Sequence, residues 1–231
     1  MSKFSSTIKP TFRTAKIVES PVCEWNHKKE QISTMSSATR QEPAADARRK
    51  DVDSVAELLE TKTTARGNNL AALSLLSPVL LVFLRHSGCT FCREALSDIK
   101  ASRAAIERSG ARIVVVHLGE VEAMLEVLRH YGLEDLDRIS DDSLDLYYAF
   151  GLHQGNWWQL AGPRVWWRGF NAAWLKGHGM GKPTGDVRQM PGMFLLDRCE
   201  VTHSFRHGSA SDRPLYEAFV RAALRQSQSG T

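Results

Sequence analysis

The chain has 231 residues, a formal net charge of +4 at pH 7 and four cysteines. This length allows one domain with a sizeable core and an extension. The basic residues are interspersed with acidic ones, so we expect no nucleic-acid partner. No segment has the length and apolar character of a transmembrane span or a signal peptide. A single close cysteine pair fits a reducing compartment, and we expect a soluble, cytoplasmic protein.

The first 48 residues are rich in Ser, Thr, Lys, Arg and Gln, and their few apolar residues follow no period. Such a segment cannot bury enough apolar surface to fold, so residues 1–48 are expected to form a disordered N-terminal extension. The basic bias at its start also fits a targeting segment, but no amphipathic repeat supports that alternative. The folded domain is expected at 49–225, with short helices at 51–61 and 70–76, and a frayed polar tail at 226–231.

The chain is organised around one predicted strand and the helix that follows it. Residues 79–84 form an unbroken apolar run rich in β-branched and aromatic residues, which predicts a strand buried on both faces. Residues 87–88, Ser-Gly, interrupt the run with turn chemistry. Apolar residues then recur mostly at three- and four-residue steps from Cys92 to Ile106, which predicts a helix. Cys89 therefore falls where this helix begins.

The position of the C-x-x-C pair at a helix start predicts redox chemistry. The thiolate is the nucleophilic form of cysteine, and unsatisfied backbone N–H groups at a helix N-terminus stabilise an anion. We therefore expect a lowered pKa for Cys89, with Arg85, His86 and Arg93 adding positive charge nearby. Cys92 lies one turn further into the helix, where it is shielded. Cys89 is predicted to attack, and Cys92 to resolve the intermediate by forming the Cys89–Cys92 disulfide bond.

Two structural explanations of the same cysteine pair are weaker. A structural zinc site needs four ligands, usually two such pairs, and the other cysteines, Cys23 and Cys199, stand alone in different contexts. We therefore expect neither a metal nor another cofactor. A purely structural disulfide across so short a loop is less favoured still. Cys199 is expected to be an exposed turn residue, and a role as an extra resolving thiol is the alternative.

The segments after the redox helix continue an α/β pattern. A second buried strand at 111–118 follows the helix, and a strand–helix–strand unit with connections of this length is parallel and right-handed. The next elements are expected as a helix at 120–131, a short strand and turn at 137–142, and a helix at 144–150 capped by Asp142 or Ser143. These elements predict a central sheet flanked by helices.

Residues 151–186 break this rhythm, because they hold five of the six tryptophans and many glycines. One interpretation is an insertion that covers an edge or the far side of the fold with its aromatic side chains buried. The other is an apolar wall beside the cysteines that selects a lipid-like substrate, a partner protein or a second copy in a homodimer. The sequence leaves both open.

The C-terminal part of the domain is predicted as an antiparallel hairpin and a helix. Residues 188–197 restart a strand, and residues 201–206 alternate apolar and polar side chains after a short turn. Ser211 or Asp212 is then expected to cap a final helix that carries Pro214 in its first turn.

The order of these elements resembles the thioredoxin fold. Proteins of that fold carry a cis-proline just before the strand that packs beside the redox cysteines, and Met190-Pro191 stands in this place. The resemblance implies that Pro191 is cis, that Met190 lies against Cys89, and that the two residues shape the substrate groove. A structural turn proline is the alternative.

Three motifs give a more specific resemblance: residues 81–94 (LVFLRHSGCTFCRE), 139–142 (ISDD) and 189–197 (QMPGMFLLD). Together they resemble the AhpC/TSA-like "peroxiredoxin-like" family, which is related to selenoprotein L and to prostamide/prostaglandin F synthase. The resemblance covers about residues 66–222. It implies a cytoplasmic antioxidant thiol enzyme that uses thioredoxin or another thiol as electron donor.

The function predicted from these residues is thiol–disulfide oxidoreduction in cell redox homeostasis. Ordinary peroxiredoxins place a Thr three residues before the attacking cysteine to orient the peroxide, and this chain has His86 there, which favours disulfide exchange. The alternative within enzymes is a thiol peroxidase for organic or lipid peroxides, with Arg188 supplying positive charge to the bound peroxide. The alternative outside enzymes is a redox-sensing module in which the tryptophan-rich segment binds a partner.

Overall fold

The computed structural model describes residues 55–155 and 188–229. The predicted N-terminal extension and nearly all of the tryptophan-rich insertion lie outside these ranges. Within them, no helix combines the length and the apolar character needed to cross a membrane.

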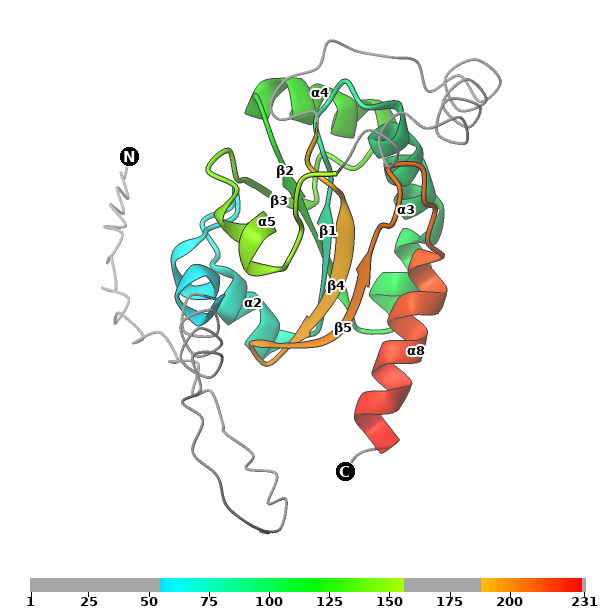
Figure 1. The fold of residues 1–231 in the computed structure, drawn as a ribbon. Coiled ribbons are helices and arrows are strands. Elements are labelled where there is room, and N and C mark those ends of the chain that lie inside the picture. Colours follow the sequence, from blue (N-terminus) through cyan, green and yellow to red (C-terminus); the bar gives the residue numbers. More distant parts are fainter. Residues whose placement is uncertain (1–54, 156–187, 230–231) are drawn as a thin grey trace, which may run out of the picture.

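A five-stranded mixed sheet forms the centre of the fold, in the order β3-β2-β1-β4-β5 (Figure 1). The strands are β1 (Val79–Phe83), β2 (Arg112–His117), β3 (Asp137–Ser140), β4 (Gly192–Asp197) and β5 (Glu200–Arg206). β1 pairs in parallel with β2, and β2 with β3. β4 pairs antiparallel with both β1 and β5. The predicted parallel unit and hairpin are therefore confirmed, and they share one sheet.

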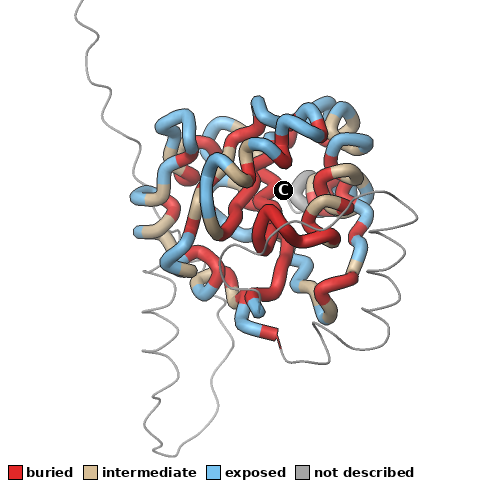
Figure 2. The backbone as a smooth tube through the Cα atoms, turned by 90° about the horizontal axis from the view of Figure 1, so that it is seen from above, coloured by how far each residue is buried: buried red, intermediate tan, exposed pale blue. Residues whose placement is uncertain are grey.

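Helices cover both faces of the sheet, which explains why every residue of β1 is buried. The helices are α2 (Leu70–Leu76), α3 (Thr90–Arg108), α4 (Val121–Tyr131), α5 (Asp145–Ala149) and α8 (Tyr216–Ser229). One apolar cluster joins the sheet to α3, α4 and α8, and it contains Cys89 and Cys92. A second cluster joins the opposite face to α2 and α5. Figure 2 shows the buried residues running through the middle of the molecule, between exposed outer turns.

The redox helix begins where the sequence predicts. Cys89 is the N-cap residue of α3, with extended backbone angles, and Cys92 lies in the first helical turn. The N–H group of Arg93 donates to the Cys89 carbonyl at 3.1 Å, which closes that turn. The preceding loop leaves the C-terminal end of β1 and is tied to the sheet, because the Leu84 N–H donates to the Val116 carbonyl at 2.8 Å.

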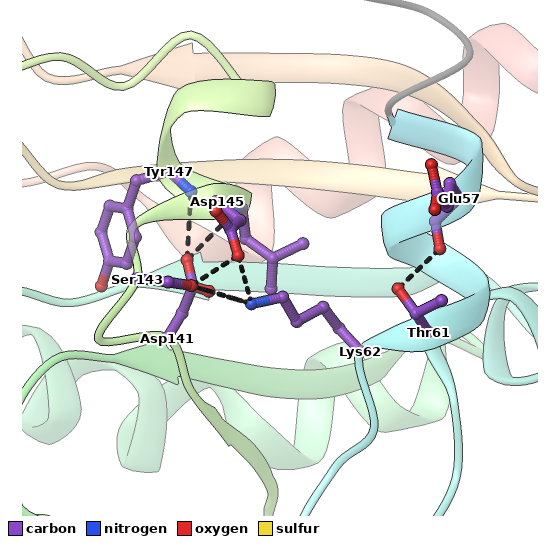
Figure 3. Close-up of polar contacts among 8 residues, drawn as sticks. Glu57, Thr61, Lys62, Asp141, Ser143, Asp145 and Tyr147 are labelled. Carbon is purple, nitrogen blue, oxygen red and sulfur yellow. Dashed lines mark hydrogen bonds and ion pairs between the residues drawn. The ribbon is translucent and has the colours of Figure 1, made fainter.

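The N-terminus of α5 is built differently from the prediction, because neither Asp142 nor Ser143 caps the helix backbone. The carboxylate of Asp141 takes that role: Oδ2 accepts from the N–H groups of Leu146 at 2.8 Å and Tyr147 at 3.4 Å (Figure 3). Its Oδ1 pairs with Lys62 Nζ at 2.7 Å. The Asp142 carboxylate instead accepts from the Gly119 N–H at 2.6 Å, which ties the loop after β2.

Tyr147 connects α5 to the loop that carries the cysteines. Its ring is fully buried against Phe83, and its hydroxyl donates to the Leu84 carbonyl, next to Arg85. The Val116 carbonyl lies 3.3 Å from the same hydroxyl. Tyr147 therefore fixes the start of the redox loop from the α5 face of the sheet, opposite the face that α3 covers.

Candidate active site

Cys89 and Cys92 lie together at the N-terminus of α3, as free thiols that are 6% and 5% exposed. The loop between β1 and α3 positions them, and the Cys89 N–H donates to the His86 carbonyl at 3.1 Å within that loop. The structure therefore brings together the two predicted cysteines. Cys89 is as deeply buried as Cys92, which differs from the expectation that only Cys92 is shielded.

The surroundings of Cys89 favour its thiolate. The side chain of Cys92 hydrogen-bonds to the Cys89 sulfur, the Arg85 guanidinium lies beside it, and the backbone N–H groups of the first α3 turn point at it. Arg85 Nη1 is 3.6 Å from Cys89 Sγ. These contacts outweigh burial and lower the pKa of Cys89 to about 6. A helix N-terminus and an adjacent cation are the two features that ordinarily activate a cysteine.

Cys92 has the opposite character. Burial raises the pKa of the Cys92 thiol well above its ordinary value, and the neighbouring Cys89 adds to the rise. The backbone N–H of Arg85 points at the Cys92 sulfur at a distance of 3.2 Å. At neutral pH the pair therefore consists of one thiolate and one thiol.

The three predicted sources of positive charge differ in what they do. Arg85 contacts the Cys89 sulfur, as described above. His86 is 5% exposed, and burial together with the Arg85 charge lowers its pKa to about 4. It is therefore neutral at pH 7, and the prediction that it adds positive charge is wrong. Arg93 donates from Nε to the Ser87 carbonyl at 3.2 Å, so it braces the loop.

Met190 and Pro191 come immediately before β4, which pairs with β1. Both residues are buried. No peptide bond in the described residues is cis, so Pro191 is trans and the expectation of a cis-proline is wrong. Arg188 is exposed, and its carbonyl accepts from the Gly155 N–H at 2.7 Å.

Sequence reasoning missed a small cavity beside Cys92, of about 20 Å³, lined by α3, the Pro191 segment and the β5–α8 connection. Its polar lining includes Arg85, His207, Asp212 and Tyr216. His207, just after β5, is held at this cavity because its N–H donates to the Pro191 carbonyl at 3.3 Å. No local sequence signal marks His207, which lies more than a hundred residues from the cysteines and reaches them only through strand pairing.

Cys199 does not belong to this site. It is 5% exposed rather than an exposed turn residue, and it packs in the cluster on the α2 and α5 face of the sheet. Its N–H donates to Ser74 Oγ at 3.0 Å. Because Cys89 and Cys92 pack on the other face, the alternative of Cys199 as an extra resolving thiol is ruled out.

Known proteins resemble this chain in part of its sequence and in its fold. The sequence pattern of the AhpC/TSA antioxidant enzyme family matches residues 98–209, which begin after the two cysteines. No curated protein sequence matches the chain significantly.

Several solved structures are similar. The Xanthomonas campestris bacterioferritin comigratory protein has a TM-score of 0.53 and 16% identity, and the match covers 74% of this chain and 95% of that chain. Peroxidoxin BcpB of Mycobacterium tuberculosis has a TM-score of 0.50 and 15% identity, over 71% of this chain and 90% of that chain. A secreted M. tuberculosis disulfide oxidoreductase has a TM-score of 0.45 and 16% identity, over 71% and 96%.

At these identities the first two similarities establish the fold alone. The mixed sheet with Cys89 at the start of α3 therefore has the thioredoxin fold, and over residues 98–209 the chain is similar to the AhpC/TSA antioxidant enzyme family.

Proposed function

We propose that the protein is a thiol–disulfide oxidoreductase in which Cys89 is the nucleophile and Cys92 the resolving cysteine. The observation that carries this proposal is the contrast between the two thiols, with the pKa of Cys89 lowered to about 6 and that of Cys92 raised. At pH 7 most Cys89 is a thiolate, while Cys92 keeps its proton until it attacks the mixed disulfide. A low-pKa attacker beside a protonated resolver is the arrangement that two-step disulfide exchange requires.

The reaction follows from these two states. The Cys89 thiolate attacks one sulfur of a substrate disulfide, forms a mixed disulfide and releases the other substrate sulfur as a thiolate. Cys92 then loses its proton and attacks Cys89, which forms the Cys89–Cys92 bond and releases the second substrate thiolate. The substrate has gained two electrons and the protein has lost two. Thioredoxin or another dithiol donor returns them by the same exchange in reverse.

Three neighbouring groups have supporting roles in this proposal. The Arg85 guanidinium, 3.6 Å from Cys89, stabilises the thiolate before attack and each time it leaves. The buried segment of Met190 and Pro191, beside the cysteine loop, shapes the groove that receives the substrate.

The proposed location is the cytoplasm, a reducing compartment that would keep Cys89 and Cys92 in their dithiol form.

Peroxide reduction is the second candidate. It is favoured by the family match, and by a similar structure described in connection with alkyl peroxide reduction. In this reaction the Cys89 thiolate would attack the peroxide, become a sulfenic acid and release an alcohol, and Cys92 would then form the disulfide and release water. Arg85 is the group placed to polarise the peroxide. His86, neutral and buried, supplies no hydroxyl donor where ordinary peroxiredoxins have Thr.

Rapid mixing of the reduced protein separates the candidates. We expect fast loss of the Cys89 thiolate absorbance with a protein disulfide, and a rate near that of a free thiol with hydrogen peroxide or an alkyl hydroperoxide. Cys89→Ser should abolish both reactions, and Cys92→Ser should stop at a trapped mixed disulfide. Fast reaction with peroxide alone would reverse the order of the candidates. Absence of turnover with any thiol donor, together with redox-dependent capture of a partner, would favour a sensor.

A further inference from the structure

A second cavity, of about 300 Å³, lies at the edge of the sheet opposite the cysteines, and we call it the edge cavity. Its lining includes Ser77, Ala111 and Asp137, which stand at or shortly before the starts of β1, β2 and β3. Cys89 instead follows the C-terminal end of β1. Small-molecule sites have volumes of roughly 300–1,000 Å³, so the edge cavity has room for a small ligand.

One carboxylate in the wall of the edge cavity lacks hydrogen-bond donors. The Asp137 side chain is 4% exposed, and its Oδ1 has no hydrogen-bond partner among the described residues. Its Oδ2 lies 3.8 Å from Arg112 Nη1, which is an ion pair beyond hydrogen-bond distance. A buried carboxylate without donors is unfavourable, because it has lost the hydrogen bonds that water would supply. A ligand that donates hydrogen bonds to Asp137 would restore them.

Most of the other charges in the wall neutralise one another. The Arg103 guanidinium binds the two carboxylate oxygens of Asp135, at 2.6 Å and 2.5 Å. The Nε of Arg103 also donates to the Glu107 carboxylate at 2.8 Å. Arg112, in contrast, is 43% exposed, and its guanidinium faces Asp137 only at the longer distance given above. The edge cavity therefore offers a ligand one acceptor and one donor side by side, Asp137 and Arg112.

This juxtaposition of opposite charges selects a zwitterion. A purely anionic ligand would be repelled by Asp137, and a purely cationic ligand by Arg112 and Arg66, which also lines the edge cavity. A metal ion is not favoured, since no three His, Cys, Asp or Glu side chains within 55–155 and 188–229 are grouped to hold one. In an α-amino acid a single carbon atom joins the ammonium to the carboxylate. Its two charges therefore lie as close together as those of Asp137 and Arg112.

The rest of the wall indicates the kind of side chain. Arg103 already neutralises the two carboxylates beside it, so no strong charge remains to hold a charged side chain. Apolar residues of the wall include Ala111, Ile113 and Leu136. An aliphatic side chain would pack against them.

We propose that the edge cavity binds a free α-amino acid with an aliphatic side chain. Its ammonium donates to the Asp137 carboxylate, and its carboxylate accepts from the Arg112 guanidinium. Both contacts are charge-assisted hydrogen bonds, which are stronger than neutral ones. The edge cavity lies apart from the cysteines, so this inference does not depend on the proposed function.

Isothermal titration calorimetry of the full reduced chain with L-leucine tests this inference. Two further probes keep the leucine side chain and remove one charge each: isoamylamine lacks the carboxylate, and isocaproate lacks the ammonium. The test variants are Asp137→Asn and Arg112→Met. Their controls are Glu134→Gln and Arg108→Met, which remove the same charges from exposed positions outside the wall.

We expect L-leucine to bind the wild type at millimolar or lower concentrations. Isoamylamine and isocaproate should each bind at least about 10-fold more weakly, because each loses one charge-assisted hydrogen bond. Asp137→Asn and Arg112→Met should each weaken the binding of L-leucine by about 10- to 100-fold, and the two controls should leave it unchanged. All four variants should keep the wild-type rate of Cys89 attack on a disulfide, which shows that they are folded.

The comparison of the three probes uses the wild type alone, so it decides the matter even where a variant fails to fold. Absence of L-leucine binding, or equal binding of isoamylamine or isocaproate, would overturn this inference and leave the proposed function intact. Unchanged L-leucine affinity in folded Asp137→Asn and Arg112→Met would also overturn it. Failure of wild-type Cys89 to react with any disulfide would overturn the proposed function alone.

Discussion

Two helix N-termini in this molecule each hold a buried group that carries or favours negative charge. At α3 the group is the Cys89 sulfur, and at α5 it is the Asp141 carboxylate. Both receive backbone N–H groups from the first helical turn, and both lie close to a cation, Arg85 in one case and Lys62 in the other. The same physical preference of a helix N-terminus for an anion serves both places.

The difference lies in what else surrounds each group. Asp141 is 1% exposed, and each of its oxygens has donors: Lys62 and Ser143 at Oδ1, and the α5 backbone at Oδ2 (Figure 3). None of the groups in that network forms a covalent bond with another member. The Cys89 sulfur has as its neighbour a second thiol, which can replace a hydrogen bond with a disulfide. A satisfied helix N-terminus is a structural anchor, whereas one that ends in two sulfurs of unequal acidity is suited to chemistry.

The largest effect that separates the two sites is expected from Asp141→Ala. This change leaves the Lys62 ammonium and the α5 N–H groups without their buried partner, so the free energy of unfolding should fall by about 3 kcal/mol. The pKa of Cys89 should stay near 6, because Asp141 is not among the groups that set it. Urea unfolding and thiolate absorbance at 240 nm measure the two quantities.

Asp145→Asn is the matched control for this change. Asp145 also pairs with Lys62, at 2.9 Å, but its side chain is 51% exposed, so its loss should cost less than about 1 kcal/mol. Equal losses for the two variants would contradict the view of Asp141 as a buried anchor.

The second prediction concerns pH and only the α3 site. The folded pKa of Cys89, about 6, lies below the unfolded value of about 8.5, so folding favours the thiolate. This contribution is fully present above the unfolded pKa and is lost as the pH falls through the folded pKa. The reduced wild type should therefore gain about 2 kcal/mol of stability relative to Cys89→Ser between pH 5 and pH 8.

Measuring that difference at each pH removes the titration of groups that both proteins share, including His86 and His207. In Cys89→Ser the serine side chain can itself cap α3. This capping adds to the free energy of unfolding a contribution that does not depend on pH. A flat difference between the two proteins over this range would show that Cys89 is not a thiolate at neutral pH.

Arg85→Met tests the cation at the α3 site and should have a smaller effect. Removing the guanidinium beside the sulfur is expected to raise the pKa of Cys89 by about one unit, which corresponds to about 1.4 kcal/mol. The pKa of Cys89 should still stay below its ordinary value, because the Cys92 hydrogen bond and the helix N–H groups lower it independently of Arg85. Arg93→Met is the control, because Arg93 bonds to the Ser87 carbonyl. Equal pKa changes in both variants would contradict a direct role of Arg85.

Much of this site was predictable from local sequence. The apolar run at 79–84, the Ser-Gly turn and the apolar spacing after Cys92 specify a buried strand, a loop and a helix, and these alone place the two cysteines. The antiparallel hairpin also followed from alternation and turn residues. Each of these signals lies within about twenty residues, where backbone geometry controls the outcome.

Most of the failures depend on what distant segments bring to a residue. His86 is neutral mainly because the fold buries it, which the residues next to it in the sequence do not reveal, and the charge of Arg85 adds to this effect. Cys199 is buried because the hairpin turn packs on α2. Asp141 caps α5 with a lysine 79 positions away as its partner. The trans state of Pro191 departs from an expectation taken from resemblance, and no residue pattern specified it.

Tyr147→Phe should have the smallest effect, and it asks whether the two N-termini depend on each other. Tyr147 begins near the Asp141 anchor, and its hydroxyl donates to the Leu84 carbonyl at the start of the redox loop. Removing this donor leaves a buried carbonyl with one fewer partner, so stability should fall by about 1 kcal/mol. The Leu84 N–H bond to Val116 remains, and it keeps the loop on the sheet.

We therefore expect the rate of Cys89 attack on a disulfide to change by less than the equivalent of about 0.5 kcal/mol in Tyr147→Phe. The adjacent Tyr148 is 48% exposed, so Tyr148→Phe is the control and should change neither stability nor rate. A loss of Cys89 reactivity much larger than the loss of stability would mean that the α5 anchor sets the geometry of the redox loop. In that case the two helix N-termini would form one functional unit, because the only change made is the hydroxyl that joins them.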